Sequence, residues 1–154
     1  MKEKAKTQND RLSTIAVKHF TGLPLAEGLG CVVHMDSDGF SFISGGSTFN
    51  LQNNRITDIC IKTDVDIRKQ YVSSVGGAVG GAVLFGPIGA MIGGRAKEKK
   101  ITEITKYLIF TYLKEEGISY ICFEISGTPD LMIANRCINV FRQRPHAQGA
   151  NVTL

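Results

Sequence analysis

Short apolar runs of strand length, each closed by turn-forming residues, constrain the fold of this chain more than any other feature. Residues 29–35 end at an Asp-Ser-Asp-Gly turn, residues 40–43 follow it, and residues 47–51 come after a Gly-Gly pair. A β-branched run then covers residues 55–62. Runs of this length separated by Gly, Asp and Asn indicate hairpins. Four of them within about 34 residues predict an antiparallel meander.

The second half of the chain predicts a further hairpin and then a helix. Residues 106–113 and 118–125 flank a Glu-Glu-Gly turn, and the first of these runs is apolar on both faces, so we expect it to be covered on both sides. Thr128, Pro129 and Asp130 are residue types that favour a helix start. Until Pro145 the apolar positions recur at three- and four-residue spacing, as in an amphipathic helix; they are Leu131, Ala134, Ile138 and Phe141.

This order of elements resembles a pleckstrin-homology-like (PH-like) domain: a mainly β (α+β) antiparallel partial barrel capped by a C-terminal helix. Residues 22–25, 49–51, 56–59 and 107–110, together with a Gly-rich insert, are similar to bacterial and phage-borne PH-like proteins of unassigned function. The resemblance implies a single PH-like domain over residues 22–144, followed by a tail, residues 145–154. We expect residues 1–21 to be flexible or weakly structured, with a short helix or a first strand around residues 15–17 as the alternative.

Phosphoinositide binding does not follow from this resemblance. Eukaryotic PH domains bind these lipids through a basic loop between their first two strands. We expect residues 36–39 to form that loop, and their sequence, Asp-Ser-Asp-Gly, is acidic.

The insert between the predicted strands, residues 72–94, has 23 residues and no charge. Its glycines recur at four-residue spacing, beside a row of small residues at positions 74, 78, 82, 86, 90 and 94. Such rows let two helices approach closely, so we interpret the segment as a glycine zipper in a helical insert. The glycines that we predict to pack another helix or to enter a membrane are Gly76, Gly77, Gly80, Gly81, Gly86, Gly89, Gly93 and Gly94.

Two interpretations of the insert stay open. A helix of 23 residues spans about 35 Å, enough for a hydrocarbon core of about 30 Å. Only nine of the residues are large and apolar, however, and Pro87 divides the segment. We therefore favour a helical hairpin folded against the barrel or a second copy over membrane insertion. The basic residues after the insert fit anionic lipid or, as the alternative, a solvated helix end; they are Arg95, Lys97, Lys99 and Lys100.

The sequence offers no motif for catalysis, metal binding or a cofactor, so we expect no enzyme activity. Cys31 and His34 have the spacing of metal ligands but lack a second pair, and we expect the four cysteines to be buried thiols. Asp64 and Asp66, near Asp58, fit an exposed helix start better than an acid/base pair.

Nucleic-acid binding is not expected either. Lys and Arg number 18 against 14 Asp and Glu, a mild excess. Aromatic residues that could stack on bases have aliphatic neighbours, so we interpret them as core residues; they are Tyr107, Phe110, Tyr112 and Phe123.

The functional expectation is a non-enzymatic PH-like binding module whose glycine zipper mediates self-association or membrane contact. The alternative is a membrane-inserting effector that permeabilises a bilayer through residues 72–94. The expected partners are a second copy or another protein, with a membrane surface as the alternative. Residues 1–10 are Lys-rich and lack the apolar stretch of an export signal, so we expect a cytoplasmic location, with membrane association as the alternative.

Overall fold

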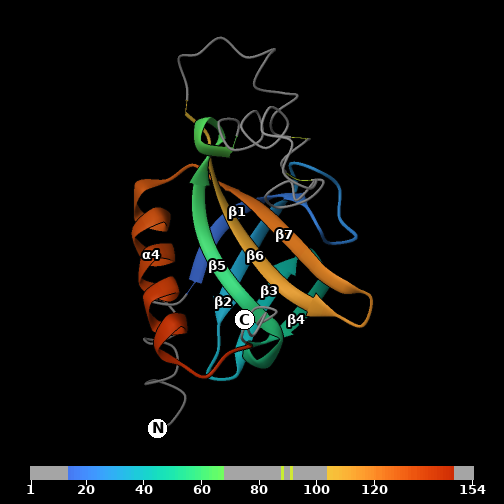
Figure 1. Ribbon diagram of the computed structural model, residues 1–154. Helices are drawn as coiled ribbons and strands as arrows, with labels where there is room; N and C mark the ends of the chain where they lie inside the picture. Colours follow the sequence, from blue (N-terminus) through green and yellow to red (C-terminus); the bar gives the residue numbers. More distant parts are fainter. Residues whose placement is uncertain (1–13, 68–87, 89–90, 92–103, 148–154) are drawn as a thin grey trace, which may run out of the picture.

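Seven antiparallel strands form one open sheet, and a C-terminal helix packs on it (Figure 1). The computed structural model describes residues 14–67, 88, 91 and 104–147. The order of strands across the sheet is β4-β3-β2-β1-β7-β6-β5. The elements are β1 (Thr14–Thr21), β2 (Gly30–Met35), β3 (Gly39–Ser44), β4 (Ser47–Gln52), the 3₁₀ turn η1 (Asn53–Arg55), β5 (Ile56–Thr63), β6 (Lys106–Lys114), β7 (Gly117–Ile125) and α4 (Thr128–Gln143).

The predicted strands, the later hairpin and the C-terminal helix are confirmed, but the meander holds for β2, β3 and β4 alone, because β5 pairs with β6 at the opposite edge of the sheet. The N-terminal expectation also needs a correction. Residues 14–21 form β1, so the expectation of weak structure is wrong for this part of residues 1–21, and the first-strand alternative is confirmed. Ile15, Val17 and His19 alternate as buried residues with exposed Ala16 and Lys18. Because a histidine occupies one of the buried positions, the alternation of apolar and polar residues is not evident in the sequence. Residues 1–13 lie outside the described part.

Strand β1 also changes which loop joins the first two strands. Residues 22–29 connect β1 to β2, whereas residues 36–38 connect β2 to β3, and Gly39 is the first residue of β3. The placement of residues 36–39 between the first two strands was therefore wrong. The loop that does occupy this place contains no Lys or Arg.

The main core lies between the inner face of the sheet and α4. Four phenylalanines at its centre stack edge to face or tilted, with Phe110 5.1 Å from the ring centroids of both Phe40 and Phe42. The ring of Phe123 lies 5.3 Å from Phe42. Helix α4 closes this core with Ala134, Cys137, Ile138 and Phe141, all buried, while Leu131 is partly buried.

Hydrogen bonds attach both ends of α4 to the sheet. Near its start, Asp130 Oδ1 accepts a hydrogen bond from the backbone N–H of Ala16, 3.0 Å away, at a point where β1 is not yet paired with β7. At its end, Arg144 donates through Nη1 to the carbonyl oxygen of Asp36, 2.8 Å away. The helix begins with Gly127 as its N-cap, so Thr128 lies inside the helix.

Candidate functional site

A second hydrophobic cluster covers the opposite, outer face of the sheet. On β6, Leu108 and Phe110 point into the main core, whereas Tyr107 and Ile109 point to this outer face, because successive residues of a strand alternate. The predicted covering of both faces of β6 is thereby confirmed. We call this group the outer cluster; its buried members are Phe20, Cys60, Ile67, Ile88, Tyr107, Ile109 and Cys122.

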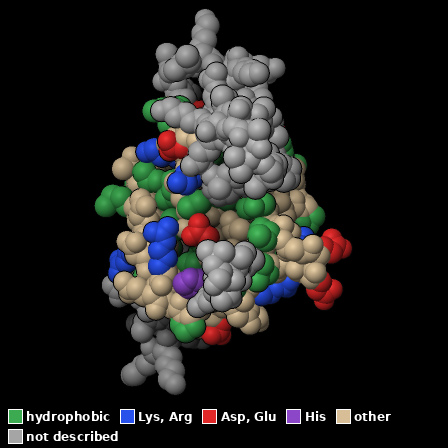
Figure 2. All heavy atoms as spheres, in the orientation of Figure 1, with side chains coloured by type: hydrophobic (Ala, Val, Ile, Leu, Met, Phe, Trp, Pro, Cys, Tyr) green, Lys and Arg blue, Asp and Glu red, His purple; other side chains and the backbone are tan. Residues whose placement is uncertain are grey.

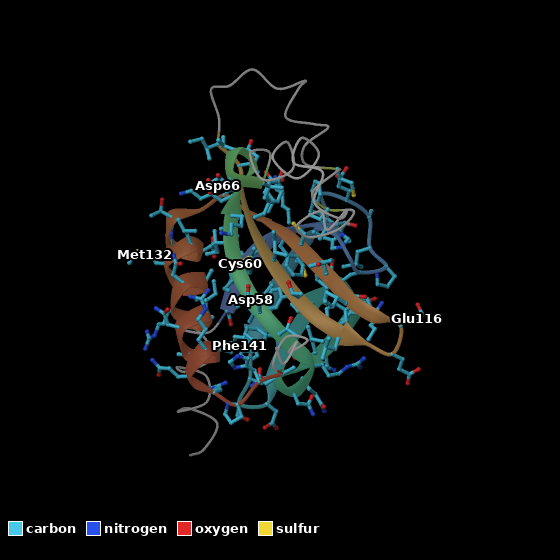
Figure 3. The ribbon with its side chains drawn as sticks, in the orientation of Figure 1. Asp58, Cys60, Asp66, Glu116, Met132 and Phe141 are labelled. Atoms are coloured by element: carbon cyan, nitrogen blue, oxygen red, sulfur yellow. The ribbon has the colours of Figure 1, made fainter. Side chains whose placement is uncertain are left out.

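The strand register explains why these residues meet. Ile109 on β6 lies opposite Cys60 on β5 and Cys122 on β7, so the three side chains form one row across the sheet. Phe20 on β1 extends the cluster, with its ring centroid 5.2 Å from that of Tyr107. Figure 3 shows Cys60 midway along β5, below Asp66 and above Asp58.

Two members of the outer cluster tie the Gly-rich insert to the sheet. Ile67, 1% exposed, lies in a helical turn that begins at residue 64, and Ile88, 2% exposed, belongs to the insert itself. The backbone N–H of Asp66 donates to Thr63 Oγ1, 3.1 Å away, as in an N-capped helix start. The expectation that Asp64 and Asp66 lie at a helix start is therefore confirmed.

Large apolar side chains are also exposed within the insert and at its junctions with the sheet. Val65 is 40% exposed, Met91 39% and Ile104 64%. Val65 follows β5, Ile104 precedes β6, and Met91 lies three residues after Ile88. Figure 2 shows hydrophobic and basic side chains beside the undescribed atoms at this end of the molecule.

The predicted site residues themselves lie outside the described residues. Within the insert, the structure describes Ile88 and Met91. The eight predicted glycines and the four basic residues after the insert therefore stay predictions. The burial of Ile88 could not be predicted from the sequence, because the other members of the outer cluster lie on four strands and in the turn at Ile67, outside the insert.

Burial makes the four cysteines poor nucleophiles. It raises the pKa of the Cys60 thiol to about 11 and that of Cys122 well above its usual value. It likewise raises the pKa of Cys137 to about 11 and raises that of Cys31. All four are free and buried, which confirms the expectation of buried thiols, and their neutral forms at pH 7 react slowly.

Cys31 and His34 do not form a metal site. Residues three apart on a strand point to opposite faces, and Cys31 lies in the main core while His34 lies on the outer face. Among residues 14–67, 88, 91 and 104–147, no group of three or more His, Cys, Asp and Glu side chains is arranged to hold a metal ion.

A polar row crosses the outer face of the other half of the sheet. Thr14, His34, Ser41 and Asn50 lie opposite one another on β1 to β4. His34 Nε2 lies 3.1 Å from Asp36 Oδ1, and Ser41 Oγ lies 3.0 Å from Asp36 Oδ2 and 2.9 Å from Asn50 Oδ1. This grouping of Ser, His and Asp has no local sequence motif, because Ser41 reaches the other two only across the β2–β3 hairpin.

The contacts among Ser41, Asp36 and His34 do not have the order found in a catalytic serine with its histidine base. Asp36 stands between Ser41 and His34, whereas an activated serine donates directly to the histidine. The other ring nitrogen of His34 lies 3.2 Å from Thr14 Oγ1. This arrangement holds four strands together and leaves the Ser41 hydroxyl bonded to groups that do not activate it.

The aromatic residues considered for base stacking belong to the protein interior. Tyr107, Phe110, Tyr112 and Phe123 are all buried, which confirms their interpretation as core residues. None of these rings is available to stack on a base.

In the described part of the chain, no helix is long and apolar enough to cross a membrane. Comparison with models of protein families, with curated proteins and with solved structures gives no match for this chain.

Proposed function

We propose that this chain is a non-enzymatic, PH-like binding module whose Gly-rich insert joins copies of the chain to one another. The observation that carries the proposal is the burial of Ile88 in the outer cluster, because it places this residue of the insert against the sheet and not in a bilayer. Seven antiparallel strands followed by a C-terminal helix support the PH-like part of the proposal.

The insert is suited to contact with another helix because of its residue types. Its rows of small side chains permit close backbone approach, for which the most direct partner is the same segment of a second copy. Met91 is helical, as Ile88 is, and its 39% exposure leaves apolar surface for such a contact. One side of the insert would thus be held by its own sheet and another by the second copy.

Membrane contact is the second candidate function, and the exposed residues at the insert favour it. Val65, Met91 and Ile104 are large apolar side chains with 39% to 64% exposure. In the sequence Met91 and Ile104 flank the basic residues Arg95, Lys97, Lys99 and Lys100, and apolar groups beside Lys and Arg are typical of a surface that contacts anionic lipid.

Replacing Gly77 and Gly81 together by leucine is expected to reduce self-association while the sheet stays folded. Leucine side chains would hold the two helices apart at the place where the glycine row predicts their closest approach. The particle mass should fall, measured by light scattering on a sizing column, and the far-UV circular dichroism of the sheet should be retained. The matched control is Gly30→Leu, because Gly30 lies in a strand with open space around it.

Liposomes distinguish the candidates. If the wild type is an oligomer without lipid and loses mass in the double variant alone, self-association through the insert is supported. If the wild type is a monomer that sediments with anionic vesicles, and the double variant does not sediment with them, membrane contact is supported and self-association through the insert is contradicted. Release of an entrapped dye would instead support the permeabilising effector. A double variant that matches the wild type in both assays contradicts a role for the glycine row.

A further inference from the structure

Among the residues that the structure describes, strand β4 forms an edge of the sheet with no protecting segment paired to it. It is the end strand, and among the described residues its backbone ladder is formed with β3 alone. Free strand edges template pairing with other chains, so proteins usually protect them with charges, prolines or bulges. The sequence of β4, Ser-Thr-Phe-Asn-Leu-Gln, contains no charge and no proline, and its register with β3 has no irregularity from Gly39 to Ser44.

The opposite edge, β5, carries the protection that β4 lacks. Its register with β6 shifts between Ile56 and Asp58, which marks a bulge or irregularity. Asp58 is exposed, and Lys62 adds a second charge to the strand. Helix α4 also packs against β5, as Figure 1 shows. The difference between the two edges indicates that β4 is kept open for pairing.

The lack of charge extends over the whole edge hairpin. Residues 40–54, which contain β4 and nearly all of β3, include no Asp, Glu, Lys, Arg or His, although 21% of the chain is charged. An edge that selects a different protein gains specificity from charges that complement those of the partner. When an edge strand pairs with the same strand of a second copy, any charge on it faces a like charge and is repelled. An edge strand without charges avoids this repulsion, so the neutral β4 favours pairing with its own copy.

The side chains of β4 also suit pairing with themselves. Phe49 is half-buried and Leu51 is buried on the core side, while Thr48 and Asn50 are exposed on the outer face. Antiparallel pairing about a two-fold axis places core-side residues opposite core-side residues and outer ones opposite outer ones. Beside Thr48, an exposed row of Ile43 and Val32 continues across the outer face.

We infer that β4 pairs antiparallel with β4 of a second copy, so that the two sheets join into one continuous sheet with two-fold symmetry. This interface is separate from the insert and does not depend on the function proposed for it. A chain with both contacts has two different surfaces for its own copies.

The test places like charges on the outer face of β4. In the full chain, Thr48→Lys with Gln52→Lys should convert the β4-paired species to half its mass, since each pair of lysines meets the same pair in the second copy. The matched control is Asn135→Lys with Asn139→Lys, which adds equal charge at exposed positions of α4 and should leave the mass unchanged. Circular dichroism and the urea midpoint check that each variant is folded.

A charge-reversed variant keeps the inference falsifiable if the lysine variant is destabilised. Thr48→Glu with Gln52→Glu should also dissociate by itself, and mixing it with the lysine variant should restore the double mass, because opposite charges then face each other. Restoration supports β4 pairing. A wild-type monomer, or β4 variants that keep the wild-type mass, overturns it.

The glycine variant separates this inference from the proposed function. Loss of mass in the β4 variants but not in the Gly77/Gly81 variant supports β4 pairing and contradicts the insert contact. The reverse result overturns β4 pairing and leaves the insert contact in place.

Discussion

Replacing Phe110 by alanine is expected to lower the free energy of unfolding by about 3–5 kcal/mol, because it empties the centre of the main core. Phe110 is 1% exposed and packs edge to face with Phe40 and Phe42, each with a centroid distance of 5.1 Å, and with Phe123 at 6.0 Å. The rings come from three strands, β3, β6 and β7, whose paired backbones cannot easily move into the space that the ring leaves. Urea denaturation measures the loss.

Ile118→Ala is the matched control for Phe110→Ala. Ile118 lies on the adjacent strand β7 and is 52% exposed, so its truncation should change the free energy of unfolding by no more than about 0.5 kcal/mol. If the Phe110 variant lost as little stability as the Ile118 variant, the assignment of the core to this face of the sheet would be wrong.

Replacing Gly22 by alanine is expected to cost at least about 2 kcal/mol, for two independent reasons. Gly22 has a φ of +110°, which residues with a side chain rarely adopt. An added Cβ would also collide with the backbone of β7, at the Tyr120 carbonyl oxygen and 2.6 Å from the Ile121 Cα. This collision could be relieved only if the backbone at Gly22 or the backbone of β7 moved.

Two other glycines separate these reasons. Gly28 has a φ of +84° but open space around it, so Gly28→Ala should cost about 1–2 kcal/mol from the conformation alone. Gly30 has open space and no positive φ, so Gly30→Ala should change stability by no more than about 0.5 kcal/mol. Chemical denaturation of the three variants should show this order, and a Gly22 variant no less stable than the Gly28 variant would contradict the close approach to β7.

The strands from β2 onward and α4 were predictable because their apolar residues follow a local period. Strand β1 was predicted only as an alternative, because one of its inward positions is His19, which is 2% exposed. Its Nδ1 lies 3.2 Å from the carbonyl oxygen of Ala26, and its Nε2 accepts a hydrogen bond from the N–H of Leu23, 3.1 Å away. These partners lie in the loop after the strand, so burial of the imidazole depends on the folded loop and not on the strand pattern.

The outer cluster was predictable only in part. The apolar faces of β6 indicated that both sides are covered, but the sequence does not say which segment covers the outer side. The row of Cys60, Ile109 and Cys122 depends on strand register, and the contribution of Ile88 depends on the return of a distant segment. Such long-range arrangements leave no local period in a sequence.

Disulfide cross-linking of a single introduced cysteine tests the central claim, that the insert joins copies of the chain, most directly. Ala78 belongs to the predicted row of small residues, and the buried native thiols, whose pKa values burial raises, contribute little background. Under mild oxidation Ala78→Cys should form a covalent dimer, whereas Glu116→Cys, at the exposed β6–β7 turn shown in Figure 3, should not. Equal cross-linking of the two variants would contradict self-association through the insert.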